Sequence, residues 1–226
     1  MQARTKTAFL FDMDGTLLDS VYDHVMAWSQ ALRETGIEVP VWKIHRRIGM
    51  SGGLFTAALI RELGHDIDEA TRSRLRDRHA EIYNATSARI PALPGAVELL
   101  KHLTANDIPW AIATSSQMKT AAPVLAKFGV DPAKHVVVTR DMVRYAKPDP
   151  DLFLAAAEKL GVDIKESCVV GDAVWDMLAS KRAHALGIGF LSGGYGEDEL
   201  IRAGAYRVFQ DPADMLAHID EVGGRR

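Results

Sequence analysis

Short apolar runs, each followed by a longer stretch with helical periodicity, dominate the pattern of this chain. Continuous apolar runs of this length are typical of strands covered on both faces, as in a parallel sheet with crossover helices. The runs expected to form strands are residues 7–12, 109–116, 135–140 and 167–172, with 188–193 and 206–209 as further strands. The alternation predicts an α/β fold built on a doubly wound parallel sheet.

One interval departs from this alternation. The chain between the first two runs is far longer than a single crossover helix requires. Within it, Val21, Val25 and Trp28 fall on one helical face, and Gly and Pro residues at 90–95 mark the return to the sheet. The expected domains are a core of residues 1–17 and 91–226 and an inserted all-helical cap of residues 18–90.

Composition narrows the classes of partner. The chain has 226 residues, 47% of them hydrophobic, and a formal net charge of −3, which is ordinary for a globular protein. Because no basic stripe is present, nucleic acid is not expected as a partner. No apolar run approaches the ~18 residues of a membrane span, and the N-terminus resembles a first strand and not a signal peptide.

The single cysteine gives an expectation about the compartment. Cys168 lies in an apolar run and has no second cysteine with which to form an intrachain disulfide. A buried, inert thiol in a reducing, cytoplasmic setting is expected, since no neighbour in sequence would lower its pKa. The protein is expected to be a monomer or a homodimer.

Acidic residues follow two of the predicted strands. Asp12 and Asp14 come directly after the first strand, and Asp172 ends the run 167–172. Ligands of open α/β sheets bind outside the carboxyl ends of the strands, and alternate residues of an extended chain face the same side. These carboxylates are therefore expected to share one cleft and to need a cation. Mg²⁺ held by Asp12 and Asp172 is expected, with Asp176 as a further or supporting ligand.

The other residues at this rim bear hydroxyl groups or a positive charge. Thr114, Ser115 and Ser116 end the second strand, and Lys147 precedes a predicted helix. Free backbone N–H groups at a helix N-terminus, a threonine hydroxyl and an ammonium group together complement a tetrahedral dianion. A phosphoryl-binding site formed by Thr114, Ser115 and Lys147 is expected.

Four motifs then carry a resemblance to a known family. "DMDGT", "ATSS", "AKPDPDLF" and "VVGDAVWDM" each follow a predicted strand. In order and spacing they resemble the four motifs of the haloacid dehalogenase superfamily. The chain is most similar to its phosphatases with a small helical cap after the first motif, of the phosphoglycolate phosphatase and beta-phosphoglucomutase type. The resemblance spans the chain and implies a Rossmann-like core.

The resemblance also implies roles for individual residues. Asp12 matches the nucleophile that attacks phosphorus and becomes an aspartyl phosphate. Asp14 matches the acid/base that protonates the leaving oxygen and then activates water, and its backbone carbonyl would face the metal. The remaining matched positions are phosphoryl-binding Thr114 and Lys147 and the acidic Mg²⁺ site of Asp172 and Asp176. A Mg²⁺-dependent phosphatase acting on a small phosphorylated metabolite is the implied function.

Other branches of the family fit less well. The dehalogenases lack the acidic residue found here at Asp14, and phosphonate cleavage requires a lysine after the cap loop, whereas Lys43 precedes it. The sugar-phosphate mutase branch remains the alternative, because "DHVMAW" resembles the first helix of its cap. The arginine that this branch carries after a loop serine is absent, since Gly52 follows Ser51.

The loop "RRIGMSGG" is expected to lie over the cleft and to select the substrate. Its candidate specificity residues are Arg46, Arg47, Gly49 and Ser51. Two neighbouring arginines favour an anionic substrate such as a phosphorylated acid or a sugar phosphate. A signalling receiver domain and a non-catalytic sugar-phosphate binder are the rivals from other classes. Chain length disfavours the first, and the presence of Asp14 disfavours the second.

Overall fold

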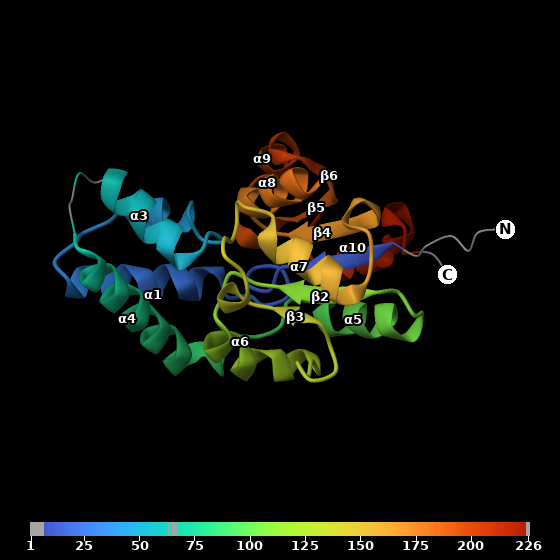
Figure 1. Cartoon of the computed structure of the whole chain (residues 1–226), viewed down its shortest axis with the longest axis horizontal. Helices are drawn as coiled ribbons and strands as arrows, with labels where there is room; N and C mark the ends of the chain where they lie inside the picture. Colours follow the sequence, from blue (N-terminus) through green and yellow to red (C-terminus); the bar gives the residue numbers. More distant parts are fainter. Residues whose placement is uncertain (1–6, 63, 65–66, 225–226) are drawn as a thin grey trace.

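A computed structural model describes residues 7–62, 64 and 67–224 of the chain. The predicted core segment 1–17 and cap segment 18–90 each include a few residues outside these ranges. Figure 1 shows a sheet with helices on both sides and, beside it, a separate group of helices that includes α1, α3 and α4.

The predicted parallel sheet is confirmed. Its strands are β1 (Ala8–Phe11), β2 (Trp110–Ala113), β3 (Val137–Val138), β4 (Ser167–Gly171), β5 (Leu186–Phe190) and β6 (Ala205–Phe209). They run parallel in the order β3-β2-β1-β4-β5-β6, which is the arrangement of a doubly wound, Rossmann-like fold. The order places β1 between β2 and β4, so residues at the carboxyl ends of these three strands become neighbours.

Helices connect the strands and fill the long interval after β1. The helices before α5 are α1 (Val21–Glu34), α2 (Val41–His45), α3 (Gly52–Glu62) and α4 (Glu69–Ser87). The later helices are α5 (Ala96–Ala105), α6 (Met118–Leu125), α7 (Asp151–Leu160), α8 (Val174–Ala183), α9 (Glu197–Ala203) and α10 (Pro212–Ala217). Short 3-10 helices are η1 (Ala126–Phe128), η2 (Arg140–Met142), η3 (Ile164–Glu166), η4 (Leu191–Gly193) and η5 (Ile219–Val222).

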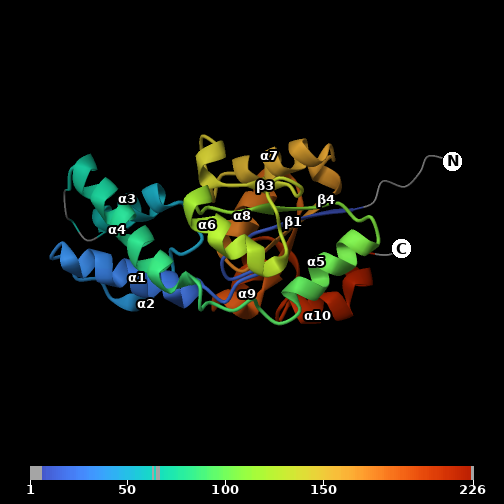
Figure 2. The same cartoon turned by 90° about the horizontal axis from the view of Figure 1, so that it is seen from below.

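Alternate residues of β1 face opposite layers of helices. Phe9 and Phe11 belong to a buried cluster with residues of α5, α6 and α10, such as Leu99. Leu10 belongs to a second cluster with Phe153 of α7 and residues of α8. Figure 2 shows α5 and α10 on one side of the sheet and α7 on the other. Burial of both faces explains why the strands read as continuous apolar runs.

Helices α1 to α4 share a hydrophobic core of their own, and we call this group the cap. Trp28 of α1, Phe55 of α3 and Leu75 of α4 lie in one buried cluster. The chain leaves β1 through a tight turn in which the Gly15 N–H donates to the Leu18 carbonyl, 2.8 Å away. The domain limits at 18 and 90 stay a prediction. Within the described part of the chain, no helix has both the length and the apolar content needed to cross a membrane.

Candidate active site

Three carboxylates from separate parts of the sequence meet at the carboxyl ends of β1 and β4. Asp12 follows β1, Asp172 follows β4, and Asp176 lies in the first turn of α8. All three are buried, and one oxygen from each lies within 4.8 Å of the others. Adjacent parallel strands bring the first two together, and one helical turn brings the third.

Lys147 is the cation of this cluster. Its side chain is fully buried, and its Nζ contacts Asp12 and lies 2.8 Å from Asp176 Oδ1. Burial alone would lower the pKa of Lys147, but the two carboxylates outweigh it and raise the pKa above its usual value. The ammonium group is therefore held charged beside Asp12.

One ammonium group does not neutralise three carboxylates. Burial, together with the charges of Asp176 and Asp14, raises the pKa of Asp12 to about 7 even though Lys147 opposes the shift. Burial and the charges of Asp176 and Asp12 also raise the pKa of Asp172 well above its usual value. Converging carboxylate oxygens with excess negative charge are the donor set that suits a hard divalent cation. Asp12, Asp172 and Asp176 can therefore hold a metal ion.

Two glycines let the backbone approach Asp172 closely. Gly15 has φ +84°, and a Cβ atom there would lie 2.4 Å from Asp172 Oδ2. A Cβ atom on Gly193 would lie 1.9 Å from the same oxygen. Thr16 donates its hydroxyl to Asp172 Oδ1 at 2.8 Å. Asp172 is thus enclosed by the turn after β1 and by the loop after β5, and only glycine fits at either contact.

Asp14 has a different environment, although it is two residues from Asp12. Its Oδ1 accepts a hydrogen bond from Ser20 at 2.8 Å and lies 3.1 Å from His24 Nε2. Its Oδ2 accepts one from Ser116 at 3.0 Å. Burial would raise the pKa of Asp14, but His24 and these hydroxyl groups outweigh it, so the pKa lies well below its usual value. Asp14 is held ionised between the core and the cap.

An aromatic stack in the cap supports His24. The His24 ring stacks on Tyr83 with a centroid distance of 3.9 Å, and its Nδ1 lies 3.1 Å from His79 Nε2. His79 stacks in turn on Trp28 at 4.1 Å. Burial and the neighbouring His24 hold the pKa of His79 well below its usual value, so this ring is neutral at neutral pH.

The three hydroxyl-bearing residues after β2 contact different partners. Thr114 is buried, and its hydroxyl accepts a hydrogen bond from the Ser116 N–H at 3.0 Å. Ser115 donates to the Gly49 carbonyl of the cap loop at 3.1 Å, while Ser116 contacts Asp14. This segment therefore joins Asp14 to the cap loop. A phosphoryl-binding role for Thr114, Ser115 and Lys147 stays a prediction.

A cavity of about 600 Å³ lies between the cap and the core. Asp12, Asp14 and Ser115 line its core side, and Arg47 and Gly49 line its cap side. Two of the predicted specificity residues, Arg46 and Ser51, are not among the described residues that line this cavity. Ser51 is buried, and its Oγ lies 3.4 Å from the Leu54 N–H.

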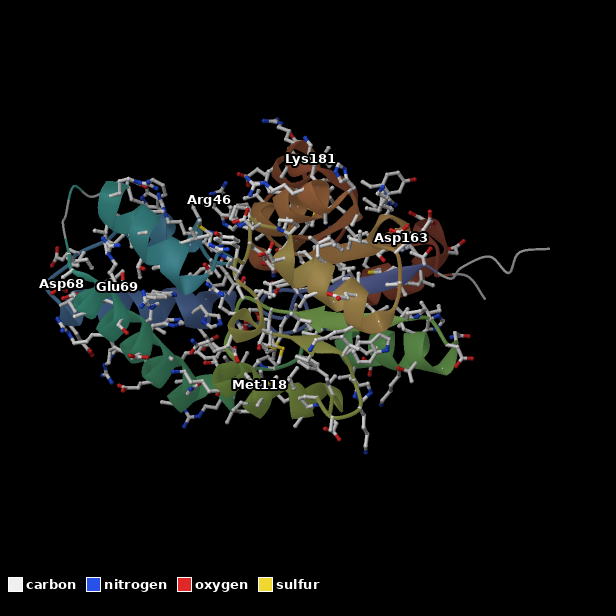
Figure 3. All side chains as sticks on the ribbon, viewed as in Figure 1. Arg46, Asp68, Glu69, Met118, Asp163 and Lys181 are labelled. Carbon is white, nitrogen blue, oxygen red and sulfur yellow. The ribbon has the colours of Figure 1, made fainter. Side chains whose placement is uncertain are left out.

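Arg46 contacts the loop after β5 and not the cavity. Its guanidinium group stacks over Tyr195 and donates to Glu199 Oε1 at 2.5 Å. The Tyr195 hydroxyl donates to the Arg46 carbonyl at 2.8 Å, and His45 Nε2 lies 2.8 Å from the Gly193 carbonyl. Figure 3 shows Arg46 where the cap helices meet the core. Residues 193–200, which begin as a glycine-rich loop after β5, therefore attach the cap to the core.

The sequence pattern assigns no site role to Ser116, His24, His79 or Tyr83. His79 and Tyr83 are four residues apart, so a shared helical face was readable from the sequence. Their contact with the Asp14 region depends on how α1 packs against α4, which the sequence pattern does not specify. From the sequence alone, His24 is expected to be a packed or solvated helix residue, and its contact with Asp14 is not predicted.

Comparison with known proteins supports one family. The haloacid dehalogenase-like hydrolase family matches residues 6–184. The chain is 36% identical over 177 residues to hexitol phosphatase A of Escherichia coli, covering 77% of this chain and 78% of that protein. It is 30% identical to the N-acetylmuramic acid 6-phosphate phosphatase of Pseudomonas aeruginosa, with 95% of each chain covered.

A solved structure agrees with this assignment. A hydrolase from Pseudomonas syringae matches with a TM-score of 0.94 and 52% identity, covering 96% of this chain and 100% of that one. The family match includes all four motifs that carry Asp12, Thr114, Lys147 and Asp172. The expectation drawn from these motifs is confirmed: the chain belongs to the haloacid dehalogenase-like hydrolases.

Proposed function

We propose that this enzyme hydrolyses phosphomonoesters of small metabolites, with Asp12 as nucleophile and Mg²⁺ as cofactor. The observation that carries the proposal is the contrast between two carboxylates in one cavity. Asp12 belongs to the buried cluster with Lys147, whereas Asp14 faces His24 and Ser116. Neighbouring carboxylates in unlike environments are suited to unlike roles, one covalent and one in proton transfer. The relatives support the reaction class, because both are named phosphatases.

In the first step, an Asp12 carboxylate oxygen attacks phosphorus and the bond to the leaving oxygen breaks. Asp14 delivers a proton to that oxygen, so an alcohol leaves and an aspartyl phosphate remains. His24 Nε2 lies 3.1 Å from the Asp14 carboxylate and is placed to exchange a proton with it. Lys147, beside Asp12, stabilises the negative charge of the transferring group.

In the second step, Asp14 accepts a proton from water while the water oxygen attacks phosphorus. The bond between phosphorus and Asp12 breaks, which releases inorganic phosphate and restores the carboxylate. Asp12, Asp172 and Asp176 would hold Mg²⁺ in both steps. Bound Mg²⁺ supplies positive charge to the phosphoryl oxygens, and this lowers the cost of bringing an anionic ester to an anionic nucleophile.

Phosphate release from a panel of phosphomonoesters tests the proposal, with Mg²⁺ and with a chelator. Wild-type protein should release phosphate only with the cation, and Asp12→Asn should lose at least about 10⁴-fold in kcat, since removing a nucleophile removes the covalent route. Activity that survives chelation or the substitution contradicts the mechanism. Conversion of hexose 1-phosphate to the 6-phosphate without free phosphate would support the mutase alternative.

A further inference from the structure

The cavity extends beyond Asp12 and must accommodate the leaving group. Its volume of about 600 Å³ lies in the range of pockets that hold metabolites of many atoms, so the site is not restricted to a two-carbon leaving group. The charges of the side chains that line the cavity therefore help to determine which leaving group binds best. This inference rests on the proposed function, because it concerns the part of the substrate that leaves as an alcohol.

Arg47, which lines the cavity from the cap loop, is already engaged by a carboxylate. Arg47 forms an ion pair with Glu62 at the end of α3 and donates a second hydrogen bond to the Lys43 carbonyl at 2.9 Å. The other oxygen of Glu62 lies 3.0 Å from Lys43 Nζ. Glu62 is therefore held by two cations from the α2 region. Arg47 would have to give up this carboxylate before it could bind an anionic group of the substrate.

The other cationic side chains that line the cavity also have partners. Among the described residues that line it, the remaining ones are Arg76, Lys119 and Arg140. Arg76 pairs with Glu69 at 2.9 Å, and Lys119 lies 3.7 Å from Asp77 across the gap between α4 and α6. Arg140 interacts with the charge of Asp141 and donates to two backbone carbonyls.

Besides apolar and aromatic side chains such as Trp28 and Phe55, the groups left to meet the leaving group are polar and largely uncharged or acidic. The lining includes the side chains of Ser73 and Gln117, and the carboxylates of Asp77 and Asp141. Such groups hydrogen-bond hydroxyl groups well, because carboxylates accept from O–H donors and amides both donate and accept. Asp77 and Asp141 also offset the charges of Lys119 and Arg140, so neither pair offers a net positive charge to a carboxylate on the leaving group.

We propose that the ion pair with Glu62 keeps Arg47 from binding anionic groups of the substrate. The cavity thereby selects phosphomonoesters whose leaving group is an uncharged, hydroxyl-rich chain or ring, such as a polyol or neutral sugar. Phosphorylated acids are discriminated against, although two arginines adjoin the cap loop. Arg46 does not offset this, because it is engaged by Glu199 and Tyr195. Glu62 is thus a specificity-determining residue that touches Arg47 and not the substrate.

The test compares glucitol 6-phosphate with 6-phosphogluconate, which differ only in a terminal CH₂OH against a carboxylate. Wild-type kcat/KM for the polyol ester should exceed that for the acid by at least about tenfold. Glu62→Gln should reduce this ratio about fivefold or more, because it frees the Arg47 charge. The double variant Glu62→Gln with Arg47→Gln should restore discrimination, which shows that the effect acts through Arg47.

Glu34→Gln is the matched control, because Glu34 pairs with Arg78 elsewhere on the cap and neither residue lines the cavity. It should leave the ratio unchanged. Equal or better hydrolysis of the acid by wild-type protein overturns the inference alone, as does an unchanged ratio in Glu62→Gln. Failure to release phosphate from either ester and from p-nitrophenyl phosphate overturns the proposed function and this inference with it.

Discussion

At the scale of single residues, the site depends on two nearby carboxylates that have different surroundings and different pKa values. Asp12 and Asp14 have the same side chain and are separated only by Met13. The Asp12 side chain is almost fully buried in the acidic cluster, whereas hydroxyl groups and His24 surround Asp14. Their pKa values shift in opposite directions as a result. The sequence places both at the end of a strand, but the contacts that separate their roles come from residues far along the chain.

Replacement of Asp14 should separate the two chemical steps. We expect Asp14→Asn to reduce turnover by about 10²–10⁴-fold, because proton transfer is lost while Asp12 remains. With p-nitrophenyl phosphate, whose leaving group needs little protonation, a burst of product should precede the slow phase. Stopped-flow absorbance measures the burst. Asp19→Asn, which removes an exposed carboxylate of the same segment, should behave as wild type. Full turnover by Asp14→Asn would exclude its role.

Metal binding should weaken as the pH falls. The pKa of Asp12 is raised to about 7 and that of Asp172 also lies above its usual value, so protons compete with a cation for these oxygens below neutrality. Without metal, both raised pKa values contribute stability at low pH that is lost as the pH rises through them. Mg²⁺ should therefore raise the Tm more at pH 8 than at pH 5.5.

Calorimetry with Mg²⁺ at both pH values, against a potassium salt of equal ionic strength, measures this difference. A Tm increase that is the same at both pH values would mean that Asp12 and Asp172 do not hold the ion.

At the scale of elements, the strands were predictable and the contacts between cap and core were not. Apolar runs identify the sheet because each strand is buried on both faces, and the residues that follow β1, β2 and β4 identify the rim. The glycine-rich segment after β5 gave no such signal. Its contacts with His45 and Arg46 join positions that are 148 and 153 residues apart, and no periodicity within either segment predicts them.

Gly193 should be needed for metal affinity. A Cβ atom at this position would overlap Asp172 Oδ2, so Gly193→Ala must displace either the carboxylate or the loop. We expect the Mg²⁺ concentration for half-maximal activity to rise about 10–100-fold, as for other changes that disturb a metal ligand indirectly. Gly196→Ala is the control in the same loop, because its nearest contact would be 3.6 Å away. Equal metal dependence in the two variants would refute this account of Gly193.

At the scale of the whole molecule, the core and the cap contribute different things to one cavity. The core supplies Asp12, with Lys147 behind it, and the cap supplies His24, Arg47 and the ring of Trp28. Four motifs spread over the sequence were enough to predict the core side, because parallel strands end at one edge. The cap side could not be predicted in the same way, since it depends on how α1 and α4 pack and on which carboxylates neutralise its arginines.

The central claim is that phosphoryl transfer passes through Asp12. Acid quenching of Asp14→Asn protein during turnover with Mg²⁺, followed by borohydride reduction and peptide mass spectrometry, tests it most directly. The account predicts that residue 12 is reduced to homoserine, as an aspartyl phosphate would be, and that omission of Mg²⁺ or of the ester abolishes the product. Turnover by this variant with no modification of residue 12, or with modification of another carboxylate, would contradict it.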